Sequence, residues 1–354
     1  MPIVENLLRT AAFGGSRPAG ADAVTKFGDG ALLTPVQRWL DAVVRGARGE
    51  YAAATAVLEP LSRHGDGVIA SLAASALASH RRQLGGHAAA LRLDGIALRR
   101  VVEAGQADHV AAGPGWGRGD PDGLDQAGAL SDALLGLAAD HLGLGRLAEC
   151  EALLTRAARA VAVSGCWRAE VRLGWVQAEL ALASGRPLDS ISPAKRALAL
   201  AEARGAARHV AKSQLVLGAG LVASGGLDEP GVLADSGALV ASDGRRGPDG
   251  QGGQKDRPGG SGQPGRPGGL GQPGESGGPD RRQRARELVG AALTEARRNG
   301  WRSLTWPALL LFADLEPEQA VWSRSRVTDE LSALLASTDP VGRRLAHDSP
   351  WVPI

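Results

Sequence analysis

The stretch LLGLAADHLGLGRLAECEALLTRAARAVAVSGCWRAE, residues 134–170, contains two helical patterns separated by a glycine turn. In each half, mainly apolar residues recur at intervals of three and four, the spacing that places them on one face of a helix. Glycine readily leaves a helix with a positive φ, so the stretch predicts a hairpin of two helices joined at Gly145. The two sets are Leu134, Leu137, Ala138, His141 and Leu142, followed by Cys150, Leu154, Ala157 and Ala158.

This unit recurs with a period of 40 residues. The turn segments GLGRLAE, ASGRPLD and ASGGLDE place Gly145, Gly185 and Gly225 at intervals of 40. The next helices begin in SGCWRAE and RGAARHV, where Arg168 and Arg208 are again 40 residues apart. Two independent landmarks with one period indicate a repeat of helical hairpins.

Two looser units precede the regular ones. Residues 35–61 and 67–102 carry the same helical spacing, with turns near Gly49 and Gly85. From Gly85 to Gly145 the distance exceeds one period by about 20 residues, and the surplus is the Gly/Pro-rich segment EAGQADHVAAGPGWGRGDPDG. That segment is predicted to be a loop.

Residues 284–303, RARELVGAALTEARRNGWRS, repeat the pattern of the second helix of the opening stretch. This alignment gives Arg302 the place of Arg168. Small residues in equivalent places are predicted to lie where the two helices of a unit approach closely. The aligned pairs are Leu154 with Leu288, Ala157 with Ala291 and Trp167 with Trp301, and the small residues are Ala157, Ala197 and Ala291.

A collagen-like tract, GGSGQPGRPGGLGQPGESGGP at residues 259–279, lies in the surplus of 54 residues between Ala207 and Trp301. It therefore belongs to the turn between two helices of one unit. Thirty-six residues of polyproline II would span roughly 110 Å, whereas the ends of a helical hairpin lie within about 10 Å. A Gly-rich coil can return to its start at modest entropic cost. We expect a disordered low-complexity loop at 228–281 rather than a triple helix.

Composition narrows the class of protein. Apolar residues make up 44% of the 354 residues but aromatic residues only 3%, which favours close-packed helices of Ala, Leu and Val. The net charge is +2 without a dense basic run, so no direct nucleic-acid partner is expected. No long apolar run and no signal-peptide pattern is present, and the two cysteines suit a reduced compartment. These features predict a cytoplasmic protein without a membrane partner.

The sequence contains no clear catalytic or metal-binding pattern. The seven histidines form no His-Glu-x-x-His pair and are expected at or near the surface. Cys150 and Cys166 are expected in the core, and Asp120, Asp122 and Asp125 in a solvated loop whose spacing misses the EF-hand pattern. Two loose G-x-G-x-x-A matches follow helices rather than strands, so they are not dinucleotide fingerprints. We expect no cofactor, no metal and no enzymatic activity.

The helical units resemble the tetratricopeptide (TPR) family, in which small or apolar residues occupy equivalent places of each unit. The 40-residue period is similar to the longer TPR-like repeats of MalT/LuxR-type transcriptional regulators, while HEAT-like packing stays open because the unit departs from the 34-residue TPR pattern. The resemblance implies a superhelix whose first helices line a concave groove for peptides or protein segments. The residues that carry it are Leu134, Leu137, Ala138, Gly145, Cys150, Leu154 and Ala157.

The predicted architecture is an all-α, TPR-like α-solenoid of about five helical hairpins with a disordered Gly/Pro-rich insertion. Its segments are a flexible N-terminal segment at 1–30, helical repeats at 31–227, the loop at 228–281, further repeats at 282–336 and a C-terminal tail at 337–354.

The predicted function is non-enzymatic binding of a protein or peptide partner in the concave groove, as an adaptor or regulatory factor. The alternative is a ligand-sensing or regulatory subunit of a transcriptional regulator. Arginine recurs at the starts of helices, where it opposes the helix dipole and so suggests a ligand carboxylate or an Asp or Glu of a neighbouring repeat. The alternative is that the arginines reflect arginine-rich codon usage and that the tryptophans pack between repeats. The candidate partner-binding residues are Arg168, Arg208, Arg302, Trp167 and Trp301.

Overall fold

The computed structural model describes residues 2–14, 33–111, 119–225 and 278–354, and every regular element in these ranges is helical. The predicted all-α fold class is confirmed. Within the same ranges, no helix has the length and apolar character needed to cross a membrane. The helices are α1 (Pro2–Phe13), α3 (Pro35–Arg48), α4 (Tyr51–Leu61), α5 (Gly67–Gln83), α6 (His87–Ala111), α7 (Gln126–Gly143), α8 (Leu147–Ser164), α9 (Trp167–Ala183), α10 (Pro187–Ala203), α11 (Ala207–Gly225), α12 (Gly278–Asn299), α13 (Arg302–Leu315), the 3-10 helix η2 (Pro317–Gln319), α14 (Ala320–Ala336) and α15 (Pro340–Asp348).

Local sequence explains where these helices begin and end. At the start of α3, the Thr34 side chain accepts a hydrogen bond from the backbone N–H of Gln37, and the Gln37 side chain accepts one from the backbone of Thr34. This reciprocal pair satisfies two donors that a helix N-terminus leaves free. The helix ends at Gly49, whose φ of 81° suits glycine because it has no Cβ.

Consecutive helices pair into hairpins: α3 with α4, α5 with α6, α7 with α8, α9 with α10, α11 with α12 and α13 with α14. The described residues thus contain six hairpins, where the sequence predicted about five. The additional one is α13–α14, which begins in the segment RSLTWPALLLFADL. A helical-hairpin repeat is therefore the architecture.

The first helices of the hairpins form a continuous inner layer. Helices α3, α5, α7, α9, α11 and α13 each pack against the next member of this series, and α13 also packs against α3. The second helices of the hairpins cover this layer from outside. The inner layer is thereby closed into a ring, an arrangement that the predicted α-solenoid did not specify.

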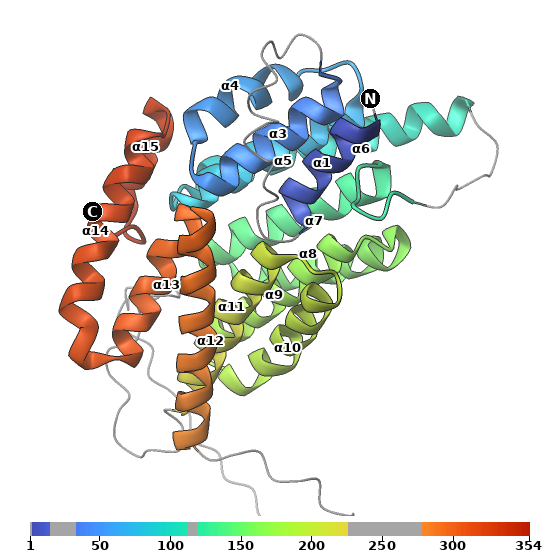
Figure 1. The fold of residues 1–354 in the computed structure, drawn as a ribbon. Coiled ribbons are helices and arrows are strands. Elements are labelled where there is room, and N and C mark those ends of the chain that lie inside the picture. The colour runs from blue at the N-terminus through green and yellow to red at the C-terminus, as the bar shows by residue number, and fades with distance from the viewer. Residues whose placement is uncertain (1, 15–32, 112–118, 226–277) are drawn as a thin grey trace, which may run out of the picture.

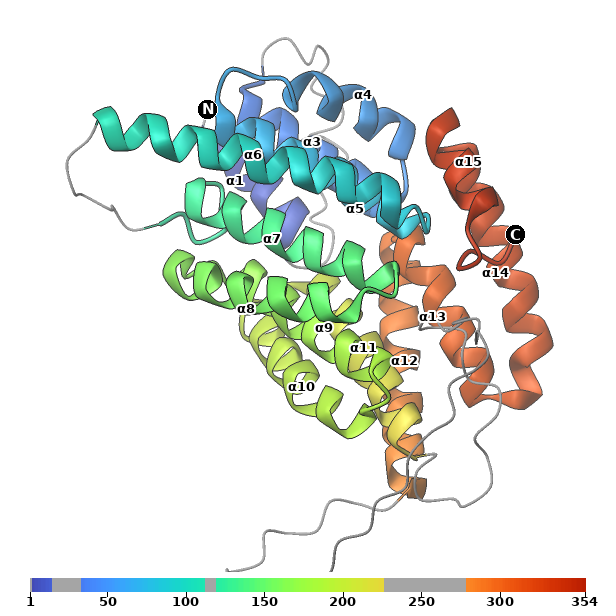
Figure 2. The same ribbon diagram turned by 180° about the vertical axis from the view of Figure 1, so that it is seen from behind.

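The C-terminal helices close the ring by packing on the first two hairpins (Figures 1 and 2). Tyr51 and Leu84, from the N-terminal hairpins, belong to the same buried core as residues of α11–α15. The backbone N–H of Ala52 donates to the carbonyl of Ser337 at 2.9 Å. Arg81 forms an ion pair of 2.6 Å with Asp339, the residue that caps α15.

Both terminal segments contain a helix that the sequence did not predict. The predicted flexible segment 1–30 contains α1, whose Leu8 and Phe13 are buried, and the predicted tail 337–354 contains α15. These segments are too short to read as hairpins in the sequence, and they become helical where they can cover an apolar surface of the ring.

The collagen-like insertion lies largely outside the described residues. Helices α11 and α12, which flank it, pack against each other as the two helices of one hairpin. The last part of the predicted loop, from residue 278, already belongs to α12.

Close helix contacts in the ring rely on small residues. Ala157 and Ala197 are buried as predicted, but Ala291 is exposed and its neighbour Ala292 is fully buried. A Cβ placed on Gly174 of α9 would lie 3.0 Å from the Cβ of Ala197 on α10, so these two helices meet with almost no space between them.

We predict that Ala197→Leu lowers the free energy of unfolding by about 1–3 kcal/mol, because the larger side chain overpacks the contact with α9. Ala199→Leu, at an exposed position of the same helix, should change it by less than about 0.5 kcal/mol. Chemical unfolding of the two variants measures both values. Equal effects would mean that Ala197 does not lie at a tight contact.

A buried ionic cluster joins three successive helices near the ring closure. Arg82 of α5 donates to Asp94 of α6 at 2.9 Å and pairs with Asp140 of α7, and neither carboxylate is exposed to solvent. Burial raises the pKa of both carboxyls, and one guanidinium does not offset the cost of two buried negative charges. The folded protein therefore retains a carboxyl proton above the pH at which the unfolded chain loses it.

Stability should consequently fall as the pH rises above the ordinary carboxyl range, by up to about 1.4 kcal/mol per pH unit for one retained proton. Asp140→Asn, which keeps the shape without the charge, should flatten this dependence. Urea unfolding at pH 6, 7, 8 and 9 measures the slope for both chains. Identical slopes would show that the cluster holds no such proton.

Candidate functional site

In the predicted row of arginines, the third member, Arg302, lies one residue before the position that is equivalent to Arg168 and Arg208. Gly165, Gly205 and Gly300 each leave the preceding helix with a φ of 60–67°, and they mark equivalent points of three units. Counting three residues from each glycine reaches Arg168, Arg208 and Ser303. The sequence alignment on Trp167 and Trp301 was therefore wrong by one position, and this shift also explains the exposed Ala291.

Each predicted arginine has partners within the chain. Arg168 of α9 is buried and donates to the Asp122 carbonyl at 2.7 Å and to the Asp132 carboxylate at 3.2 Å. Arg208 of α11 donates to the Ser303 hydroxyl at 3.3 Å. Arg302 donates to the carbonyl of Ala333 at 3.0 Å, outside the row. The carboxylate of a neighbouring repeat that was predicted as a partner is, for Arg168, that of Asp132 on α7. Burial opposes the negative charge of Asp132, but Arg168 and Arg172 hold the pKa of this carboxyl below its usual range.

The predicted tryptophans also lie at contacts between units. Trp301 is buried at the start of α13. Trp167 meets His209 edge-on with ring centroids 4.9 Å apart, and His209 also stacks on Trp175 at 5.5 Å. His80 stacks on Tyr51 at 4.8 Å. Both histidines are buried, contrary to the expected surface positions, and burial lowers their pKa, for His80 to about 3.

The loop before α7 is held by hydrogen bonds to its carboxylates. Asp125 caps α7 by accepting from the backbone of Gly128 at 2.7 Å, and its other oxygen accepts from the backbone of Asp120 at 2.5 Å. Asp122 accepts from the Trp167 indole at 3.1 Å. Asp120 in turn accepts from the backbone of Asp122 at 2.8 Å. These contacts fix the positions of two carboxylates, so the loop that was predicted to be solvated is held in place by hydrogen bonds.

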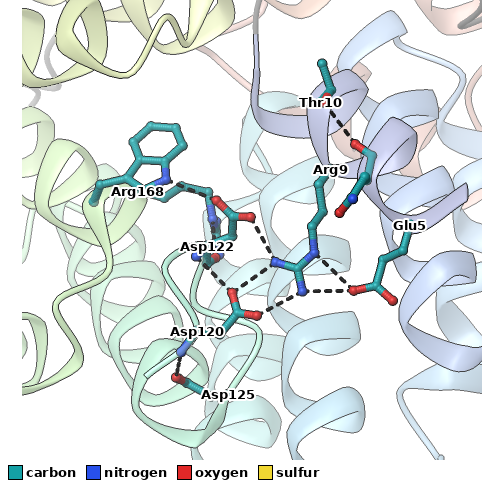
Figure 3. A network of polar contacts seen from close by, with 9 residues as sticks. Glu5, Arg9, Thr10, Asp120, Asp122, Asp125 and Arg168 are labelled. Atoms are coloured by element: carbon teal, nitrogen blue, oxygen red, sulfur yellow. Dashed lines mark hydrogen bonds and ion pairs between the residues drawn. The ribbon is translucent and has the colours of Figure 1, made fainter. Parts of the chain in front are cut away.

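Helix α1 lies across this loop, and Arg9 is its central contact (Figure 3). The guanidinium donates to both oxygens of Asp120, at 3.0 and 2.8 Å, and to Asp122 at 2.8 Å. Its Nε also donates to Glu5, one turn earlier, at 3.1 Å. A two-pronged contact of this kind fixes the orientation of the guanidinium as well as its charge.

The apolar side of α1 completes the contact. Leu8, Ala12 and Phe13 are buried together with Trp39 of α3 and Trp167. The Phe13 ring lies 6.0 Å from that of Trp39, and the Arg168 guanidinium lies 4.5 Å from the Phe13 ring centre. We call the loop 119–125 together with Trp39, Trp167 and Arg168 the α1 seat.

Helix α1 occupies the interior of the ring. It contacts α3 and α11, two inner helices that are not neighbours in the series, and runs beside α3 in Figure 1. Its opposite face stays open to solvent, with Ile3 and Leu7 exposed. A helix of the chain itself thus lies against the inner helices α3 and α11.

Electrostatics favours the pairing of Arg9 with the loop. Burial opposes the charge of Asp120, but hydrogen bonds from Arg9 and the backbone outweigh it and lower the pKa of that carboxyl. The hydrogen bond to Asp120 in turn raises the pKa of Arg9. Among the described residues, no group of three His, Cys, Asp or Glu side chains has the arrangement needed to hold a metal ion.

The sequence contained a signal for this site that the repeat analysis did not use. In PIVENLLRTAAF, Val4, Leu8 and Ala12 recur at intervals of four, the spacing of a helix with one apolar face. Nothing local connects this helix with the aspartates, because Arg9 and Asp120 are 111 residues apart.

The fold defines a class, an all-helical protein built of repeated helical hairpins. No protein-family model matches the chain, and no curated protein shows significant sequence similarity to it.

We predict that Arg168→Ala lowers the free energy of unfolding by about 3 kcal/mol, because it removes a buried partner of Asp132 and a support of the Asp122 loop. Arg302→Ala should cost only about 1 kcal/mol, the loss of one hydrogen bond to a carbonyl. Thermal and urea unfolding measure the difference. Equal costs would restore the predicted equivalence of the two arginines.

Proposed function

We propose that this chain is a non-enzymatic, TPR-like protein-binding module of the kind found in cytoplasmic adaptors and regulatory factors. Its partner is a helical protein segment, which binds on the inner layer at the α1 seat. The observation that carries the proposal is the position of α1, because a helix lies there with both apolar and charged contacts.

The chemistry of the seat suits a peptide better than a small molecule. Trp39 and Trp167 provide apolar surface, and about 1.5–3 kcal/mol comes from burying each large apolar side chain such as Leu8 or Phe13. The carboxylates of Asp120 and Asp122 bind a cationic side chain at one end of the seat. Apolar anchors beside a directional charge contact are the arrangement by which grooves recognise amphipathic helices.

The 40-residue unit supports the comparison with TPR-like repeats of MalT/LuxR-type regulators, in which the first helices line the binding surface. Closure of the ring places that surface in its interior. A partner segment must therefore be short, about the three turns of α1.

The test is recovery of partners from the producing cells with the full-length chain. Asp120→Asn combined with Asp122→Asn removes both carboxylates of the seat, and the matched control is Glu149→Gln with Glu151→Gln on the exposed face of α8. We expect a partner recovered by the unaltered chain to be retained by the α8 variant and reduced at least tenfold by the seat variant.

Quantitative mass spectrometry gives the ratio, and circular dichroism checks that both variants keep the helical fold. Equal recovery by the seat variant would show that partners bind elsewhere. Recovery of no partner at all would contradict the proposed function.

A further inference from the structure

The α1 seat is held in shape by residues other than those of α1. The ring's own Asp125, Trp167 and Arg168 contact Asp120 or Asp122 through hydrogen bonds of 2.5–3.1 Å. None of these contacts involves a residue of α1. The two carboxylates are thus positioned by the ring, and Asp122 lies beside the indole of Trp167.

Helix α1 is a short element that packs on the ring through one of its faces. Of its side chains, Leu8, Ala12 and Phe13 are buried, while Ile3 and Leu7 are exposed. Arg9 keeps a fifth of its side chain in solvent. A helix of 12 residues is marginal in water, so α1 folds where it docks.

The aspartates tie α1 to the ring by charge, and within the described part of the chain their carboxylates form ion pairs with Arg9 alone. Asp122 meets the neutral indole of Trp167 and the side chain of Arg9, and Arg168 reaches only its backbone carbonyl. When α1 leaves, a basic group of another helix can take its place without rearranging the loop.

We propose that the α1 seat is an exchangeable helix-binding site and that α1 is its resident intramolecular ligand. The partner is an amphipathic helix that carries an arginine next to a leucine and an aromatic residue four positions after the arginine, as Leu8, Arg9 and Phe13 do. The inference rests on the proposed function and gives the partner its chemistry.

Competition with α1 follows from its covalent connection. A tethered ligand presents itself at an effective concentration on the order of millimolar. A partner must therefore exceed the affinity of free α1, or α1 must be weakened, before the seat opens. In the intact chain, the seat is therefore occupied by α1.

The experiment uses a fluorescent synthetic peptide, PIVENLLRTAAFG, which is residues 2–14, titrated against the full-length chain. Leu8→Asp in the chain places a charge at a buried position of the tethered α1 and should vacate the seat. We expect the peptide to bind this variant at least tenfold more tightly than the unaltered chain, measured by fluorescence anisotropy. Arg9→Glu in the chain, which repels Asp120, is a second way to vacate the seat and should act in the same direction.

Three controls assign the binding to the seat. A peptide with Arg9→Ala and one with Phe13→Ala should each bind the Leu8→Asp chain at least tenfold more weakly. Adding Asp120→Asn and Asp122→Asn to that chain should have the same effect on the unaltered peptide. Binding should also weaken as salt rises, because the contact is partly an ion pair.

The inference is overturned if the peptide binds neither Leu8→Asp nor Arg9→Glu while both retain their helical circular dichroism. Loss of the helical signal in both variants also overturns it, since α1 would then be a required part of the core. Equal affinity for the unaltered and vacated chains would place the peptide elsewhere. If the peptide fails while a cellular partner still depends on Asp120 and Asp122, the proposed function stands and only this partner chemistry is wrong.

Discussion

Contact between the last and first inner helices is the constraint on which the rest of the structure depends. An open solenoid leaves an apolar end at each terminus, which capping repeats must cover. Here the packing of α13 on α3, with the Arg81–Asp339 pair and the shared core around Tyr51, covers both ends at once. Closure also defines the interior where α1 lies, so the candidate site is a product of the ring and not of any single repeat.

Charged side chains tie successive units of this ring together. Arg168 meets Asp132 between α9 and α7, and Arg82 meets Asp94 and Asp140 among α5, α6 and α7. Burying such groups is costly unless they are paired, so these ties specify the arrangement of helices more than they stabilise it. Helices rich in alanine and leucine could slide past one another, and a fixed ion pair opposes such sliding.

The α1 seat and the inter-repeat ion pairs share a residue, which connects the proposed binding with the packing of the ring. Arg168 contacts Asp132, the Asp122 loop and the Phe13 ring, so it connects an inter-repeat tie with the occupied seat. A helix that replaces α1 would meet the same guanidinium. The function proposed for the chain thus depends on an arginine that the sequence analysis singled out, although for a different contact.

Sequence alone determined the features that depend on local spacing. Apolar residues at intervals of three and four predict helices, glycines 40 residues apart predict turns, and both appear as hairpins because each unit carries its own signals. The register at Gly300 could also have been predicted from the sequence. Aligning the helix-ending glycines instead of the tryptophans places Ser303, not Arg302, beside Arg208. Ring closure and the docking of α1 were decided only by tertiary structure. Arg9 with Asp120 and Arg81 with Asp339 join residues 111 and 258 positions apart, and no local pattern can encode which of many charges meet across such distances until the helices have packed.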